Sequence, residues 1–174
     1  MARSDHTESD LAALVLRLSV GPMLIAHGAN KLAGKGGLEG TRRWFDALGL
    51  RPAWFHARLA AATEVAAGTL VTVGALEPLP EAAVIGLMTT AALTDHRGKG
   101  FFIFKGGWEY VAVVAAAATG LATLGHGRWS VDAVIGRRRQ GPLAAAAAVA
   151  LGLANAAALV ATSYRPATDE DGQR

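Results

Sequence analysis

The chain of 174 residues carries a formal net charge of +3, and 52% of its residues are hydrophobic. Soluble domains have an apolar share of about 45–50%. This composition, with a mean hydropathy of +0.29, therefore favours a small membrane protein. The chain has no cysteine, which excludes a disulfide framework, thiolate catalysis and a thiolate metal site. Any redox role therefore depends on a bound cofactor or on a partner.

The first apolar segment runs from about Asp10 to Gly34. The residues before it, MARSDHTESD, are more acidic than basic, and Arg17 interrupts the apolar stretch. This is not the pattern of a cleavable signal peptide. We therefore expect the segment to remain as a membrane helix.

Four further apolar segments predict membrane helices. They are Arg58–Leu76, Leu79–His96, Trp108–Gly125 and Pro142–Tyr164. The last is free of charge and has the roughly 20 residues that are needed to cross a hydrocarbon core of about 30 Å. The alternating pattern of a membrane barrel is absent. The predicted fold class is all-α, a polytopic membrane helical bundle in the plasma membrane.

The bundle is expected to form one domain. Residues 10–132 are its predicted core, residues 142–164 an additional transmembrane helix, and residues 165–174 a disordered polar tail. Positive charges fall in loops on both sides of the five crossings, so they leave the orientation open.

The basic residues do not predict a nucleic-acid partner, although the isoelectric point is about 9.7. They are scattered through short loops, and the only run is the arginine triplet at 137–139. Beside membrane helices, such a run contacts anionic lipid head groups or fixes topology. We therefore expect a lipid bilayer as partner and no nucleic acid.

Three cationic or titratable residues share one face of the first helix. At about 100° per residue, Arg17, His27 and Lys31 fall within an arc of roughly 80°. At 1.5 Å per residue, Arg17 lies about 15–20 Å from the other two along the axis. The pattern predicts two separate polar layers inside the bundle.

The first layer is a candidate ligand-binding site. His27, Lys31, Glu64, His96 and Glu109 are expected to converge there from four helices. An isolated carboxylate in lipid is costly, so Glu64 is expected to pair with Lys31 or His27. The alternative is that these residues only hold the helices together. Five titratable groups exceed that need, and intramembrane ionisable clusters are functional candidates.

The second layer is expected to be structural, with an Arg17–Asp132 ion pair. No metal site is predicted, because no helix carries two histidines at positions i and i+4.

Five segments in this order resemble the DoxX family of bacterial membrane proteins. They are RLSVGPMLIAHGANKLAG, ATEVAAGTLVTVG, DHRGKGFF, GGWEYV and GHGRWSVD, and together they span about Leu14 to Asp132. The resemblance implies a four-helix membrane core, to which the helix at 142–164 is an addition. It also places the chain near subunits of thiosulfate:quinone oxidoreductase and proteins of membrane redox maintenance. The family-like polar residues here are Arg17, His27, Lys31, Glu64, Glu109 and Asp132.

Two functions are considered. The first is an accessory or subunit of a membrane redox system that binds a quinone-like ligand. His27 and Lys31 would donate to the head group, and Glu64 or Glu109 would relay protons. The alternative is a non-enzymatic membrane scaffold or a subunit that binds a lipid-like ligand. A small-solute transporter is a weaker third, since no internal repeat is visible. The reaction, the redox partner protein and the oligomeric state stay open.

Overall fold

The computed structural model describes residues 2–137 and 139–166 and contains helices but no strand within these ranges. The helices are α1 (Ala2–Ala33), α2 (Gly37–Leu48), α3 (Ala53–Val73), α4 (Leu79–Leu93), α5 (Glu109–Leu124), α6 (Val131–Val134) and α7 (Pro142–Ser163), with a 3-10 turn η1 (Ile103–Lys105). The predicted disordered tail falls outside the described residues from position 167 onward.

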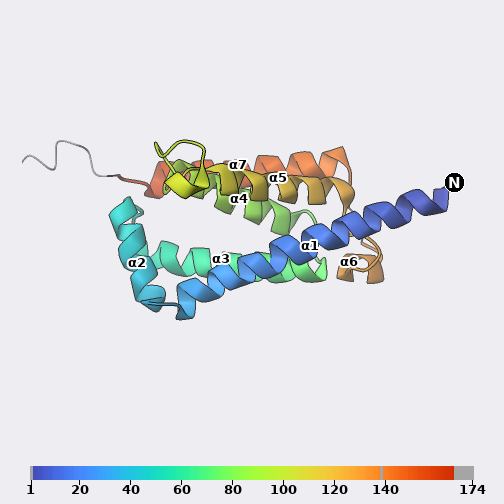
Figure 1. The fold of residues 1–174 in the computed structure, drawn as a ribbon, viewed down its shortest axis with the longest axis horizontal. Helices are drawn as coiled ribbons and strands as arrows, with labels where there is room; N and C mark the ends of the chain where they lie inside the picture. Colours follow the sequence, from blue (N-terminus) through green and yellow to red (C-terminus); the bar gives the residue numbers. More distant parts are fainter. Residues whose placement is uncertain (1, 138, 167–174) are drawn as a thin grey trace, which may run out of the picture.

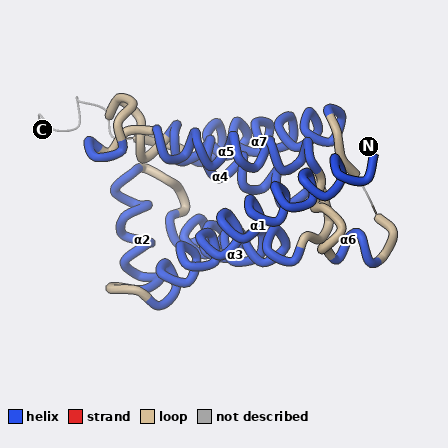
Figure 2. Tube along the Cα trace, turned by 45° about the vertical axis from the view of Figure 1, so that its right-hand side comes forward, coloured by secondary structure: helices blue, strands red, loops and turns tan. Residues whose placement is uncertain are grey.

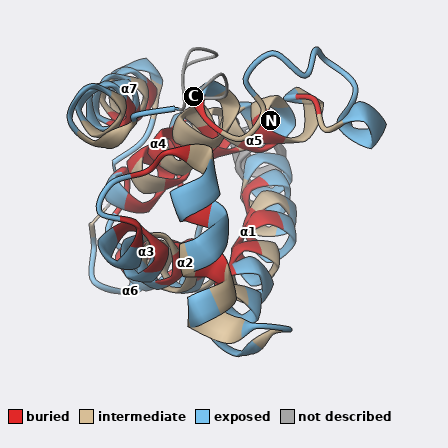
Figure 3. Ribbon diagram, turned by 90° about the vertical axis from the view of Figure 1, so that its left-hand side faces the viewer, coloured by how far each residue is buried: buried red, intermediate tan, exposed pale blue. Residues whose placement is uncertain are grey.

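The long helices form two layers, with the two shorter ones α2 and α6 at opposite ends (Figures 1 and 2). Helices α1 and α3 pack together in one layer, and α4, α5 and α7 form the other. Buried residues line the inner sides of both layers (Figure 3). The main core cluster includes Leu24, Val71, Val84 and Leu121.

Helices form at all five positions where the hydropathy predicted them. The segment between α1 and α3 differs, because residues expected to form a loop build the amphipathic helix α2. Its Thr41 and Phe45 are buried, while Glu39 and Arg42 form a salt bridge on the exposed side. The amphipathic spacing of apolar residues was the available signal for this helix.

Glycines allow α1 and α3 to pack closely. A Cβ on Gly68 would lie 2.7 Å from the Gly21 carbonyl oxygen, and a Cβ on Gly28 would lie 2.9 Å from that of Ala61. Real side chains do not tolerate such distances, so the small residues fix the contact between the helices.

Helix α7 packs on the core of the same chain. A Cβ on Gly152 would lie 2.8 Å from the Ala82 carbonyl oxygen of α4. After α7, Tyr164 forms an isolated β-bridge with Leu50, in the turn between α2 and α3. The last predicted helix is therefore joined to the rest of the bundle at its C-terminal end.

Within the described parts of the chain, two helical segments are long and apolar enough to cross a membrane, Thr7–Ala33 and Pro142–Ser163. Both expose most of their surface, and large apolar side chains such as Leu143 point outward at 76% exposure. Helices α4 and α5 are apolar, but with 15 and 16 residues they reach only about 23 Å. The expectation of five crossings therefore remains a prediction.

Candidate functional site

A cavity lies between the two layers of helices, near α2. Its volume is about 460 Å³, within the range of roughly 300–1,000 Å³ that is typical of small-molecule sites. Residues from α1, α2, α3, α4, α5 and α7 line it, so every long helix contributes to its wall. We call it the interlayer cavity. Apolar side chains form most of its surface, including Trp44, Phe45, Leu59, Leu87 and Leu159.

A salt bridge between Lys31 and Glu64 forms part of the cavity wall. The Lys31 Nζ atom donates to both carboxylate oxygens of Glu64, at 2.7 Å each. The two side chains are only 14% and 9% exposed. The predicted pairing of Glu64 with a cation of α1 is confirmed, because the antiparallel packing of α1 and α3 places the two residues at the same depth.

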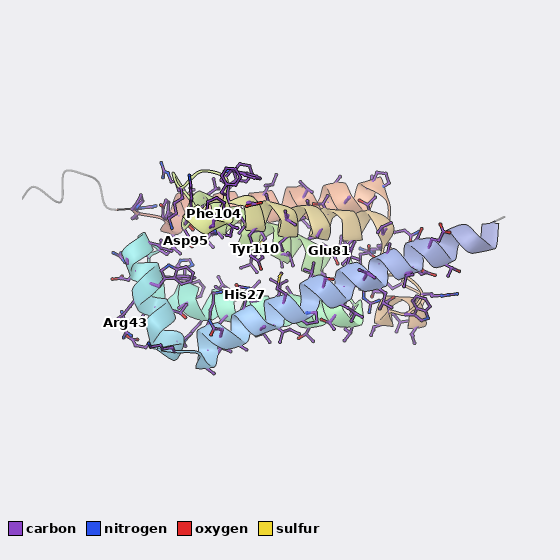
Figure 4. All side chains as sticks on the ribbon, viewed as in Figure 1. His27, Arg43, Glu81, Asp95, Phe104 and Tyr110 are labelled. Carbon is purple, nitrogen blue, oxygen red and sulfur yellow. The ribbon has the colours of Figure 1, made fainter. Side chains whose placement is uncertain are left out.

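His27 and Tyr110 approach each other from opposite layers (Figure 4). Their rings are 6.0 Å apart, and the Tyr110 hydroxyl lies 3.4 Å from His27 Nε2. The same hydroxyl is 3.0 Å from Met23 Sδ. His27 is exposed, so a ligand entering the cavity can reach its ring.

His96 belongs to the same cavity. Its Nδ1–H donates to the Gly106 carbonyl oxygen at 2.6 Å, which holds the ring against the loop before α5. Its Nε2 lies 4.0 Å from Asp95, another cavity residue. In a neutral ring with this tautomer, Nε2 is an acceptor.

The expectation that Glu109 joins this group is wrong. Glu109 is absent from the cavity lining, and its carboxylate accepts a hydrogen bond from the Ile103 backbone N–H at 3.1 Å. It is the first residue of α5 and faces the preceding loop, so it organises that loop instead.

The cavity lining also includes polar residues that the sequence analysis missed, among them Asn155, Thr90 and His56. Asn155 is the one amide of α7 and stands in the middle of a long apolar run, which was its signal. Thr90 lies on α4. His56 is buried, with Nε2 3.2 Å from the Arg51 carbonyl oxygen and Nδ1 without a hydrogen-bond partner.

The expected Arg17–Asp132 ion pair is not formed. The Arg17 guanidinium instead donates to four backbone carbonyl oxygens, at 2.8–3.1 Å. Two belong to the end of α3 and two to the loop before α6. They are Val71, Thr72, His126 and Trp129. Gly74 has a positive φ of 70°, and a Cβ there would lie 2.8 Å from Arg17 Cζ. Arg17 therefore joins α1 to two chain turns through their carbonyls.

Asp132 is part of a different buried cluster. Its carboxylate accepts hydrogen bonds from the backbone N–H groups of Leu76 and Glu77, at 3.0 and 2.9 Å. His126 lies between two carboxylates, with Nε2 2.6 Å from Glu81 and Nδ1 3.2 Å from Asp132. We call Glu77, Glu81, His126 and Asp132 the acidic cluster.

Burial and hydrogen bonding set the charge states of the acidic cluster. Burial raises the pKa of Glu77 to about 7. It also opposes the charge of His126, but the hydrogen bond and charge of Glu81 raise the pKa of this histidine overall. Burial opposes the charge of Asp132 as well, and the backbone donors of Glu77 and Leu76 lower its pKa overall. Without another cation, an imidazolium between carboxylates is the favoured state.

The arrangement of α1–α4 can now be compared with known proteins. The DoxX family model matches residues 12–97, which extend from α1 to just beyond α4. The chain belongs to the DoxX family. It is therefore a membrane protein, and its DoxX region supplies most of the interlayer cavity.

The family match ends before α5 and α7, so the resemblance in GGWEYV and GHGRWSVD lies beyond the matched residues. Neither the curated proteins nor the solved structures gave a match to this DoxX chain.

Proposed function

We propose that this DoxX protein binds the head group of a quinone-like amphiphile in the interlayer cavity and serves as an accessory of a membrane redox system. The observation that carries the proposal is the convergence of His27, Lys31, Tyr110 and His96 on one apolar cavity of about 460 Å³. A quinone combines polar oxygens with a long apolar tail, so it needs donors at one end of a site and apolar walls elsewhere.

The donors of the cavity fit the two oxygens of such a head group. Lys31 has three N–H donors, and its Glu64 partner uses those that face the carboxylate. The Tyr110 hydroxyl is held only by the weak acceptor Met23 Sδ and by a long contact to His27. The unpartnered Nδ1 of His56 adds a buried polar atom in the wall. Of these groups, the Tyr110 hydroxyl has the weakest partners and is the one most easily turned toward a ligand.

When bound, a quinone would supply two-electron redox chemistry that no side chain of this cysteine-free protein offers. The residues of the chain would orient the head group and manage protons. Glu64 and His27 both line the cavity, so they would be the groups that pass protons to or from the head group. Glu109 lies outside the cavity, so it has no part in this relay.

The proposal includes a multi-pass arrangement in the plasma membrane. Its support is the pair of long apolar helices α1 and α7 and the apolar outer surface of the bundle. In this arrangement α2, which is amphipathic and contributes Trp44, Phe45 and Leu48 to the cavity wall, lies along the membrane surface at one end of the bundle.

Trp44 makes the binding directly measurable, because it lines the cavity and its fluorescence reports on a ligand beside it. We expect a short-chain benzoquinone to quench the fluorescence of the detergent-solubilised protein in a saturable way. Removal of one donor costs about 1.4 kcal/mol, so His27→Ala should weaken binding by about tenfold.

Two controls separate the cavity from unspecific partition into detergent. Trp44→Phe should abolish most of the saturable quenching, and Glu109→Gln should leave the affinity unchanged within about twofold. Equal quenching in the Trp44→Phe variant, or equal affinity after His27→Ala, would contradict quinone binding in this cavity.

The second candidate function is a non-catalytic subunit that binds a lipid. The mainly apolar lining of the cavity favours it. Mass spectrometry of molecules extracted from the gently solubilised protein distinguishes the two occupants. A phospholipid retained by the wild type and lost in His27→Ala would assign the cavity to a lipid.

A further inference from the structure

The acidic cluster lies outside the interlayer cavity and is not explained by the proposed quinone site. It is located near α6, between the turn that follows α3 and the loop that follows α5. Figure 4 shows Glu81 on α4, farther from α2 than Tyr110 is. Three carboxylates and one imidazole meet in this small volume, and all four residues are at most 3% exposed.

The internal hydrogen bonds do not satisfy this cluster. Glu77 is 2% exposed and its Oε1 has no hydrogen-bond partner, and one oxygen of the fully buried Glu81 is also unpartnered. Such buried acceptors are costly unless a proton or a cation meets them. Glu77, His126 and Asp132 face a space of about 30 Å³, which is enough for one ion or one water molecule.

The neighbouring cations do not neutralise the three carboxylates. All the bonds of Arg17 go to backbone carbonyl oxygens. Arg137 lines the same small space, but among the described residues no salt bridge joins it to Glu77, Glu81 or Asp132. Even with His126 protonated, the cluster keeps more acceptors than donors.

The geometry points to a binding site for one divalent transition-metal cation, such as Zn²⁺ or Mn²⁺, held by Glu77, His126 and Asp132. One donor atom from each residue lies within 4.8 Å of the other two. Ligands about 2.0–2.2 Å from one ion are at most about 4.4 Å apart, so binding requires a contraction of a few tenths of an ångström.

Glu81 has the position of a residue that orients the metal-binding histidine. It lies 2.6 Å from His126 Nε2, so it can accept the proton of this nitrogen and leave Nδ1 free to bind the metal beside Asp132. Metal-binding histidines commonly donate their other N–H to a carboxylate in this way. The mixed nitrogen and oxygen donors favour a transition metal over Ca²⁺, which takes 6–8 oxygen ligands.

The test uses the full chain in detergent, purified with a tag free of histidine and stripped with a chelator. Competition with a chromophoric zinc chelator then gives the affinity and stoichiometry. We expect about one Zn²⁺ per chain in the wild type. Glu77→Gln should weaken the site by at least about tenfold, and Glu81→Gln by about 10–100-fold.

Control variants separate loss of the metal from loss of the fold. Glu77→Gln removes an unpaired buried charge, so the metal-free variant should unfold at the same or a higher temperature than the metal-free wild type. Replacement of the other loop histidine, in His96→Asn, should leave Zn²⁺ binding unchanged. Absence of stoichiometric Zn²⁺ binding, equal binding by Glu77→Gln, or preference for Ca²⁺ over Zn²⁺ and Mn²⁺ would overturn the assignment.

Discussion

The two ends of the bundle use buried polar residues in opposite ways. Near α2, one balanced pair, Lys31–Glu64, forms part of the wall of an open cavity of about 460 Å³. Near α6, the acidic cluster surrounds a space of about 30 Å³ and has more acceptors than the protein can satisfy. The difference indicates that space and charge balance, more than the number of titratable residues, decide what each end can bind.

The largest loss of stability is expected near α6, from Arg17→Met. The change leaves four carbonyl oxygens without their donor, so we expect the free energy of unfolding to fall by about 4 kcal/mol or more. Thermal unfolding in detergent would measure it. The control Arg58→Met removes an exposed arginine and should cost less than about 1 kcal/mol. Similar effects of both variants would show that the four contacts of Arg17 contribute little.

In the wall of the interlayer cavity, a double-mutant cycle can measure the coupling energy of the Lys31–Glu64 pair. Lys31→Met and Glu64→Gln each leave one partner without its neighbour, and each should cost about 2–4 kcal/mol. The double variant should cost at least about 1 kcal/mol less than the sum of the two. Strict additivity in unfolding measurements would mean that the pair is not coupled.

A smaller effect tests whether α7 supports only the interlayer cavity or also the acidic cluster. Gly152→Ala places a Cβ against α4 and should cost about 1–3 kcal/mol, with weaker benzoquinone binding, because Asn155 and Leu159 of α7 line the interlayer cavity.

The matched control is Gly120→Ala on α5, where a Cβ meets no atom within 4 Å. It should stabilise the protein by up to about 1 kcal/mol through helix propensity. Zn²⁺ binding should stay unchanged in both variants. A loss of Zn²⁺ binding in Gly152→Ala would show that the two ends are coupled through α7.

The long helices and most of the polar layer around Lys31 could be predicted from the sequence, because both follow from the spacing of residues along helices. Long apolar runs indicate helices. Counting residues along two antiparallel helices then shows that Lys31 and Glu64 lie at the same depth in the bundle. The partners of Arg17 could not be found in this way, because backbone carbonyls leave no trace in the residue pattern. Glu109 was misplaced because the first residue of a helix can face either the bundle or the preceding loop.

The acidic cluster escaped sequence analysis because its residues come from separate turns. Glu77 and Glu81 are spaced i, i+4 around the start of α4, and His126 and Asp132 flank the short segment before α6. Each pair alone is typical of polar residues at the end of a helix. Only the packing of the two turns brings them together.

The bridge between Leu50 and Tyr164 has a consequence for biosynthesis. The hydrogen bonds Arg51 N to Ser163 O and Arg165 N to Gly49 O join segments that are more than a hundred positions apart. The chain is made from its N-terminus at about 5–20 residues per second. The α1–α3 layer therefore exists for several seconds before α7 emerges. During that interval the interlayer cavity lacks the part of its wall that α7 supplies, and this wall is completed only when α7 has docked.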